Sequence, residues 1–401
     1  MAIKGDFFSE KREWSKLKDQ ILDHYLSPYL AKITMNGYPT RIADCFAGKG
    51  AFDDGSEGSP LIIARRVGEA QSFARPHNSD VKAVFIEKKY AEDLHANLIG
   101  RKGCEVISGD YEEYLKRFLA DPKKDQNYFF YVDPYGIKSL DFSSFVDLRD
   151  AGFRSLELLI NLNTTGFLRE GRRLLKLKRD VPEWANDLDY EEDGLNTIFR
   201  MNKIAAGEYW QGILARYQSG DIDFHGAEAA FTDAYIQKMH GLFTYALSVP
   251  IMERSNHMPK YRLVFATDHH AGFFLMAGEM TKAWRALLAG ERAGQLYLFD
   301  DAQDKGSSIQ ERIREEISTP IELKTLLTRL IRKHSIGHSP AEYCVAIKEG
   351  DGAEFTVMRE PNLTKKGQTS HSMDYDKYKI TVKIGPGMSK FIQHEIQPDL
   401  L

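Results

Sequence analysis

Four short apolar segments in the N-terminal part of the chain each end at an acidic residue, and this pattern constrains the fold more than any other feature. The segments span 41–46, 82–86, 105–107 and 128–132, and the acids at or just after their ends are Asp44, Glu87, Asp110 and Asp133. Segments with helical periodicity, 61–74, 90–99, 111–119 and 142–150, lie between or after them. Strands that alternate with helices form right-handed crossovers, so the sequence predicts an α/β fold whose parallel sheet is covered on both faces.

The segments beyond residue 150 complete this sheet. Residues 156–162 are an apolar fifth strand, 167–241 a helical insertion, and 243–252 with 260–266 two β-rich runs typical of a hairpin. A helix is predicted over 271–288. A parallel core closed by an antiparallel hairpin gives a Rossmann-like sheet of seven strands, which is the strand count of the class I methyltransferases.

The C-terminal part of the chain is predicted to form a second, smaller domain. Two helical patterns, 309–317 and 321–334, precede β-prone runs at 342–348 and 354–359 around a turn at 349–352, and another run at 378–384. Helices followed by a β-hairpin suggest a winged-helix-like domain over 309–401. A polar linker, 299–308, is expected to join it to a methyltransferase-like domain over 1–298.

Composition indicates an ordinary soluble protein. The chain has 401 residues, of which 42% are apolar and 28% charged, and its net charge of −4 argues against a uniformly basic nucleic-acid binder. Its three cysteines are too far apart for a metal-binding spacing. The sequence shows no apolar run of the roughly 18 residues that span a membrane and no signal peptide, so we expect a cytoplasmic protein with no membrane association.

The glycine turn after the first strand predicts a binding site for S-adenosylmethionine (SAM). Gly48 and Gly50 let the backbone approach the amino-acid part of that cofactor, and Asp44 is placed to face its positive charge. Glu87 is placed to accept the ribose hydroxyls, and Asp110 to accept from the adenine amine. The predicted cofactor-binding residues are Asp44, Phe46, Ala47, Gly48, Gly50, Glu87, Lys88, Asp110, Tyr111 and Asp133.

The run Asp133-Pro134-Tyr135-Gly136 after the fourth strand predicts an amine-methylating active site. The Asp133 carboxylate and the Pro134 carbonyl are placed to accept from an exocyclic amine, whose delocalised lone pair makes it a poor nucleophile that needs positioning. Tyr135 is placed to stack on a target base. We therefore predict Asp133, Pro134 and Tyr135 as catalytic residues, and Tyr135 and Gly136 as substrate-binding residues.

Two further features have competing interpretations. The basic run 169–179 contains Arg172, Arg173 and Lys176, which we predict to bind substrate phosphates, although charge runs are more often solvated faces. Trp14 and Lys18, one helical turn apart, either line the cofactor pocket or form a core tryptophan with a solvated lysine, and the second interpretation is favoured.

With these residues identified, the chain resembles the three-Cys-motif partner protein (TcmP) family over most of residues 5–290. The matching positions are Phe7, Phe8, Trp14, Lys18, Tyr25, Asp44, Phe46, Ala47, Gly48, Gly50, Gly58, Ser59, Pro60, Phe85, Ile86, Glu87, Gly109, Asp110 and Asp133 to Gly136. The resemblance implies a bacterial or archaeal protein, an appended winged helix, and a radical-SAM-like partner encoded nearby that carries the three-cysteine motif. It implies a fold and a partner more than a reaction.

The form of the Asp-Pro motif bears on the acceptor. Asp-Pro-aromatic-Gly is similar to the motif of tRNA guanine-N2 methyltransferases. It departs from the Asp-Pro-Pro-Tyr form of adenine-N6 enzymes, because Tyr135 stands in place of the second proline. The motif therefore leaves guanine N2 and other amines as candidate methyl acceptors.

Three functions follow from these observations. The leading hypothesis is SAM-dependent N-methylation of a base in RNA or DNA. The second is a catalytically silent, SAM-binding scaffold for the radical-SAM-like partner, because a fold does not imply a function. The third is a metal-dependent nuclease of a mobile or defence locus, in which the four strand-end acids gather a divalent metal; the glycine turn has no purpose in that hypothesis.

Overall fold

The computed structural model describes residues 11–180, 197–252, 258–293, 308–335, 337–364 and 366–385. Within these ranges the chain divides into two compact units, Met1–Glu279 and Met280–Leu401, which are treated separately below. Phe7, Phe8 and residues 181–196 of the predicted insertion lie outside the described residues. So does the predicted linker, apart from Ser308.

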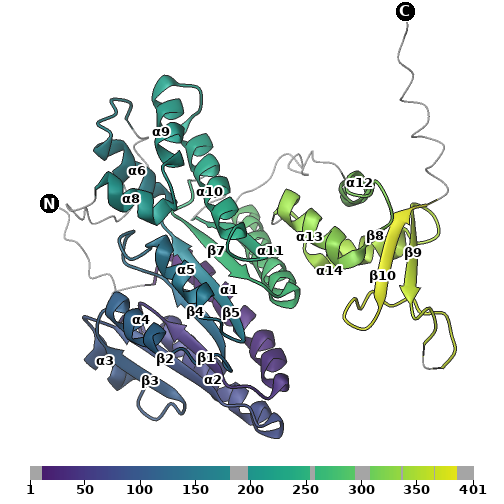
Figure 1. The fold of residues 1–401 in the computed structure, drawn as a ribbon, viewed down its shortest axis with the longest axis horizontal. Helices are drawn as coiled ribbons and strands as arrows, with labels where there is room; N and C mark the ends of the chain where they lie inside the picture. Colours follow the sequence, from purple (N-terminus) through teal and green to yellow (C-terminus); the bar gives the residue numbers. More distant parts are fainter. Residues whose placement is uncertain are drawn as a thin grey trace, which may run out of the picture. The chain divides into compact units, whose positions relative to one another are not determined.

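The described residues of the first unit form one seven-stranded sheet (Figure 1). Its strand order is β3-β2-β1-β4-β5-β7-β6, and β7 alone runs antiparallel to its neighbours. The strands are β1 Thr40–Asp44, β2 Val81–Glu87, β3 Cys104–Ser108, β4 Asn127–Val132, β5 Ser155–Leu162, β6 Tyr245–Ile251 and β7 Tyr261–Thr267. This is the arrangement of the class I methyltransferases, so the predicted fold class is confirmed.

Helices cover both faces of this sheet (Figure 1), as a parallel sheet requires. The described helices of the first unit are α1 Glu13–Ile33, α2 Ser59–Ala74, α3 Ala91–Asn97, α4 Tyr111–Ala120, α5 Phe142–Asp150, α6 Thr164–Leu174, α8 Ile198–Ala205, α9 Tyr209–Ser219, α10 Phe224–His240 and the start of α11 His270–Ala293, with short 3₁₀ helices at Thr34–Asn36 and Arg75–His77. The boundary between the two units falls within α11, after Glu279. Every residue of β4 and β5 is buried. These two strands at the centre of the sheet therefore read as apolar runs rather than as alternating ones.

The two faces of the central strands differ in chemistry. Tyr128, Phe130, Ile160 and their neighbours on one face pack with α4, α5 and the helices of the insertion, α6 and α8–α10, in one continuous apolar core. The opposite face lies under α1, where the ring of Tyr25 stacks on Phe129 with 5.7 Å between ring centroids. This second face also carries the polar side chains of the site described below.

A buried carboxyl group joins α1 to the sheet and to α11. The Glu157 side chain of β5 accepts from the Tyr25 hydroxyl at 2.5 Å and from the Thr267 hydroxyl at 3.3 Å. A Cβ at Gly272 of α11 would lie 2.3 Å from its Oε1, so only glycine permits this approach. Burial raises the pKa of Glu157 to about 7, against the hydrogen bonds from Tyr25 and Thr267, which lower it.

The second unit contains α12 Ile309–Glu315, β8 Ile321–Glu322, α13 Leu323–His334, α14 Pro340–Glu349, β9 Phe355–Glu360 and β10 Lys379–Ile384. Its described strands form a three-stranded sheet in the order β8-β10-β9, in which β9 and β10 pair antiparallel. The leading residues of the predicted helix 321–334 belong to β8.

One predicted strand of this unit is wrong, because 342–348 lies inside α14. The alternation of Tyr343, Val345 and Ile347 favoured a strand, but the buried residues, Tyr343, Ala346 and Ile347, follow helical spacing. Ser339 forms a capping box with Glu342, and Pro340 follows it in the first turn. The hairpin is accordingly formed by β9 and β10, not around 349–352.

We predict that Glu157→Gln stabilises the protein increasingly as pH rises. A folded-state pKa above the ordinary value gives stability that is present below about pH 4.5 and is lost as pH rises through 7. Glutamine retains an acceptor for Tyr25 but does not ionise. The difference in the free energy of unfolding between variant and wild type, measured by urea unfolding, should grow by on the order of 3 kcal/mol between about pH 5 and pH 8. A stability difference independent of pH would contradict the burial of this carboxyl group.

Candidate active site at the carboxyl edge of the sheet

The glycine turn closes tightly after β1. Gly48 and Gly50 have φ values of 62° and 87°, which side-chain-bearing residues rarely adopt. A Cβ at Gly50 would come within 3.0 Å of a Leu94 methyl carbon, and the Gly50 carbonyl accepts from the Gly58 amide at 2.8 Å. Phe46 is half-buried and Ala47 buried in the same turn. The turn is therefore specific to glycine, as the sequence predicts.

Glu87 at the end of β2 holds this turn in place. Its Oε2 accepts from the Gly48 amide at 2.8 Å, and its Oε1 accepts from the amides of Lys89 and Tyr90 at 2.7 and 3.0 Å. A carboxylate offers about four lone-pair positions, so about one remains for a ligand hydroxyl. Accepting both hydroxyls of a ribose would require one backbone bond to be exchanged.

Asp110 and Tyr111 follow β3 at the start of α4. Asp110 caps the helix by accepting from the Glu112 amide at 2.9 Å, and the Lys88 ammonium lies 3.2 Å from its other oxygen. Although partial burial raises it, these contacts lower the pKa of Asp110 below its ordinary value. The Tyr111 ring packs on Phe46 at 5.1 Å, and its buried hydroxyl has no hydrogen-bond partner among the described residues.

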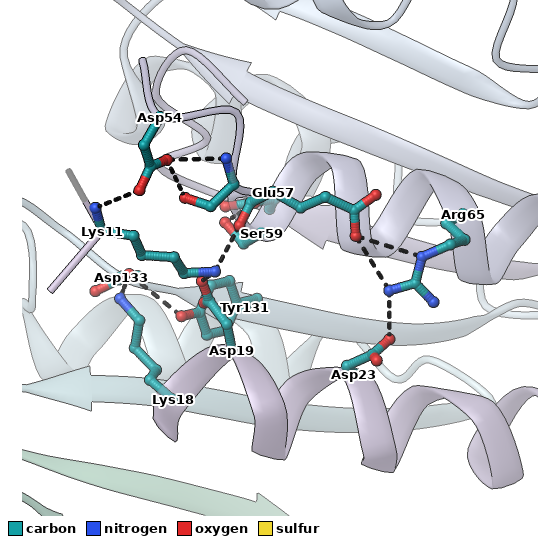
Figure 2. A network of polar contacts seen from close by, with 12 residues as sticks. Lys11, Lys18, Asp19, Asp23, Asp54, Glu57, Ser59, Arg65, Tyr131 and Asp133 are labelled. Carbon is teal, nitrogen blue, oxygen red and sulfur yellow. Dashed lines mark hydrogen bonds and ion pairs between the residues drawn. The ribbon is translucent and has the colours of Figure 1, made fainter. Parts of the chain in front are cut away.

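The carboxylate of Asp133 is the point on which side chains from three elements converge. Lys18 of α1 forms an ion pair with its Oδ2, to which the Tyr131 hydroxyl of β4 also donates at 3.2 Å. Asn161 of β5 donates its amide Nδ2 to Oδ1 at 2.6 Å. Figure 2 shows Lys18 reaching from α1 to the strand end, where Tyr131 meets the same carboxylate.

Lys18 is buried, with 6% of its surface exposed, so the favoured interpretation of a solvated lysine is wrong. It lies on the same helical stripe as Leu22, Tyr25 and Tyr29, which pack on the sheet. Although burial lowers it, the carboxylates of Asp133 and Asp19 raise the pKa of Lys18 above its ordinary value, so its ammonium stays charged. Trp14 lies in α1 too, but its side chain is outside the described residues.

The charges continue from Asp133 toward the loop after the glycine turn (Figure 2). Lys11 pairs with Asp19 at 2.7 Å and donates through Nζ to the Glu57 carbonyl at 2.5 Å. The carboxylate of Asp44, wholly buried, accepts from the Ser59 hydroxyl at 2.7 Å and from the Phe46 amide at 3.3 Å. Burial and the nearby Asp133 carboxylate raise the pKa of Asp44 to about 7, against its hydrogen bonds, which lower it.

The remaining residues of the Asp-Pro motif differ in exposure. Pro134 is buried, whereas 64% of Tyr135 is exposed to solvent. Gly136 has a φ of 102°, and a Cβ there would meet no atom within 4 Å. The loop thus presents an aromatic ring to solvent two residues from the converging carboxylate.

Arginines of the basic run 169–179 form hydrogen bonds and ion pairs with residues of the same segment. Arg172 donates to the Arg179 carbonyl at 2.5 Å and pairs with Asp180 at 2.5 Å, and Arg173 pairs with Glu170 at 2.6 Å. Lys176 is exposed and has a φ of 53°. A substrate role for these three residues stays a prediction, and no contact described above connects them to Asp133.

The sequence-based prediction left out Asn161, and for Lys18 it favoured a solvated lysine over one that lines the pocket. A signal existed for each. Lys18 occupies the apolar stripe of α1, and Asn161 interrupts the otherwise apolar end of β5. A polar residue at a position whose pattern demands burial needs a partner, and both residues find that partner in Asp133.

The groups at the carboxyl edge of the sheet fit SAM in their chemistry. The turn of Gly48 and Gly50 provides the close backbone approach, Glu87 keeps a lone-pair position for a ribose hydroxyl, and Asp110 is partly exposed beside the Phe46–Tyr111 ring pair. Buried Asp44 supplies negative charge near the strand ends. A ligand with a cation, a hydroxyl and an aromatic amine matches these groups.

Comparisons with known proteins give only distant likenesses. No protein-family model and no curated protein matches the sequence. Among solved structures, a SAM-dependent methyltransferase from Aquifex aeolicus is 13% identical, over 65% of this chain and 100% of that one, with a TM-score of 0.26. Spermidine synthase from Thermotoga maritima is 9% identical, with a TM-score of 0.30. The match covers 68% of this chain but slightly less than two thirds of that one, 65%.

A third solved structure, a conserved hypothetical protein from Streptococcus pyogenes, is 16% identical over 32% of this chain and 69% of that one, with a TM-score of 0.23. The strand order of the sheet, rather than these likenesses, defines the fold as that of class I methyltransferases. No helix within the described ranges is both long and apolar enough to cross a membrane.

We predict that Lys18→Met destabilises the protein by about 3–5 kcal/mol, because it leaves the Asp133 carboxylate without its cation. Adding Asp133→Asn should recover part of this loss, with a coupling energy of about 0.5–3 kcal/mol in a double-mutant cycle measured by urea unfolding. Lys123→Met, which removes an exposed partner of Asp121, is the control and should cost little. Additive effects of the two site substitutions would show that the pair is not coupled.

Proposed function

We propose that this protein is a SAM-dependent methyltransferase that N-methylates an exocyclic amine of a nucleic-acid base. The observation that carries the proposal is the Asp133 carboxylate, fixed by Lys18, Tyr131 and Asn161 at the end of β4. It lies at the same edge of the sheet as the glycine turn and Glu87, where ligands of open α/β sheets bind.

In this proposal SAM, when bound, supplies an electrophilic methyl group, and the chain positions the acceptor. Glu87 and Asp110 hold the ribose and the adenine, and Asp44 balances the positive charge. Asp133 accepts a hydrogen bond from an N–H of the amine and orients its nitrogen, which contributes by positioning and electrostatics. The same carboxylate is placed to take the proton that the nitrogen loses when it is methylated. The side chain of Tyr135 is exposed beside Asp133 and supports the stacking of a flipped base.

Surface residues of the two units bear on the nucleic-acid substrate and on the partner protein. Exposed Lys176 and Lys178 favour a polyanion near α6. The element order of the second unit, α12-β8-α13-α14-β9-β10, supports a winged helix. Its α14, however, exposes Val345 and Glu349 beside Lys348, a surface that suits a protein better than phosphates. We therefore propose that this unit contacts the radical-SAM-like partner implied by the resemblance to TcmP.

One observation favours the scaffold as a second candidate function. The Lys18 ammonium already occupies Asp133, the group that an acceptor amine requires. A protein that binds SAM without transferring its methyl group would keep this pair intact. The nuclease hypothesis has no such support, and no three His, Cys, Asp or Glu side chains of the described ranges are grouped to hold a metal ion.

Methyl transfer from labelled SAM to RNA, DNA and free nucleosides tests the proposal. We predict that Asp133→Ala lowers transfer by about 100-fold or more, because the amine loses its acceptor, while the Kd for SAM stays within about threefold. Asp121→Ala, at an exposed carboxylate, is the matched control and should retain full transfer. Undiminished turnover in Asp133→Ala would refute the assignment, and binding without transfer in the wild type would favour the scaffold.

We also predict that SAM affinity weakens as pH falls through 7. The pKa of Asp44 is about 7, and a bound cation favours its ionised form, so SAM binding releases a proton below that pH. The Kd should rise by up to about tenfold per pH unit below 7. Calorimetric titrations should show a weaker trend for S-adenosylhomocysteine, which lacks the sulfonium charge, and for Asp44→Asn. Identical trends for both ligands would rule out this coupling.

A further inference from the structure

Asn161 carries a buried acceptor that no described residue pairs. The residue is 2% exposed at the end of β5, and its Nδ2 donates to Asp133 Oδ1 at 2.6 Å. Its own carbonyl oxygen, Oδ1, is buried and has no hydrogen-bond partner among the described residues. Turning the Asn161 amide over would place its oxygen against the Asp133 carboxylate oxygen. The carboxylate therefore fixes the amide orientation in which Nδ2 faces Asp133.

An unpaired buried acceptor costs about 1–3 kcal/mol and is rare in native proteins. It persists where a ligand or an ordered water supplies the missing donor. Here the missing donor belongs beside Asp133, whose carboxylate already holds one amino nitrogen, that of Lys18. The surroundings of Asn161 Oδ1 therefore suit a nitrogen that carries hydrogen atoms.

We infer that Asn161 is an acceptor-binding residue that recognises a primary amino group together with Asp133. The inference rests on the proposed function and narrows the acceptor to an unmodified primary amino group. Lys18 and Tyr131 donate to Asp133 Oδ2 and Asn161 to Oδ1, so of about four lone-pair positions about one remains, on Oδ1. An –NH₂ group has two N–H donors, one for this position and one for Asn161 Oδ1.

This pairing sets the specificity of the site. A hydroxyl group or a ring N–H carries one hydrogen and leaves one of the two acceptors unpaired, which is the arrangement that polar sites reject most strongly. A singly methylated amine also retains one N–H only. The site therefore selects an unmodified –NH₂ group and disfavours a second methylation of the same nitrogen.

Sinefungin tests the inference without knowledge of the acceptor. In this SAM analogue a carbon bearing an amino group replaces the methylated sulfur, so that an amine stands where the methyl group would be. S-adenosylhomocysteine lacks any group there. We predict that Asn161→Leu lowers the preference for sinefungin over S-adenosylhomocysteine, measured as a ratio of Kd values, by about tenfold. The Kd for S-adenosylhomocysteine should change little.

Two further variants separate this role from a loss of structure. Asn161→Gln keeps an amide, with both a donor for Asp133 and an acceptor oxygen, and should retain the preference for sinefungin. Thr165→Val removes a nearby buried hydrogen bond, from the Thr165 hydroxyl to the Pro259 carbonyl, and should leave the ratio unchanged. Thermal unfolding of each variant shows whether it folds, and the ratio is read only from folded protein.

The outcomes distinguish the two levels of the proposal. If the wild type binds both ligands and Asn161→Leu keeps the wild-type ratio, the role of Asn161 is refuted and the proposed function stands. If Asn161→Leu does not fold, loss of the preference in folded Asn161→Gln overturns the inference, and its retention supports it. If the wild type binds neither ligand, the SAM site itself is absent, and the proposed function fails together with the inference.

Discussion

The buried ion pair between Lys18 and Asp133 ties the N-terminal helix to the end of the central strand, and the arrangement of the site depends on it. Each of these charges is costly to bury alone, because an ion loses its hydration when it leaves water. The cost is offset only by partners in good geometry, here the Tyr131 hydroxyl and the Asn161 amide together with the opposite charge. The position of α1 follows, since Lys18 reaches the carboxylate only while Tyr25 and Tyr29 pack on Phe129. The pair thus couples the packing of a helix to the orientation of a candidate catalytic group.

One face of the sheet packs in the apolar core, and the opposite face carries the polar side chains of the candidate site. One face is closed by a continuous apolar core with the insertion helices, in which Phe167 stacks on Phe231 and Trp210 is fully buried. The other face carries Asp44, Asp133 and Glu157, whose carboxylates accept from side chains or backbone amides, and Asn161, whose Nδ2 donates to Asp133. The helix α1 supplies donors to two of these groups, Lys18 to Asp133 and Tyr25 to Glu157. The insertion side also holds a buried carboxylate, Glu228, and there Arg262 and Thr164 supply the donors.

The sequence predicts the sheet and the strand-end acids well but not the contacts among them. The apolar strands, the glycine turn and the acids Asp44, Glu87, Asp110 and Asp133 follow from local patterns, because strand ends and turns have local signals. Lys18 and Asn161 are different, since their partner Asp133 is 115 and 28 residues away. Local sequence patterns do not identify the distant residue with which a buried polar side chain will pair. The strand predicted at 342–348 failed for a related reason: β-branched and aromatic residues alternate there, but the capping box at Ser339 and burial on a helical stripe decide in favour of α14.

The central claim is that the carboxyl edge of the sheet binds SAM through the glycine turn and Glu87. Calorimetric titration of the purified protein with SAM and with S-adenosylhomocysteine, repeated on Glu87→Ala, tests it most directly. We predict micromolar binding of both ligands that is lost in the variant, because Glu87 both holds the Gly48 amide and supplies the ribose acceptor. Absence of binding to the wild type, or equal binding to Glu87→Ala, would contradict the claim.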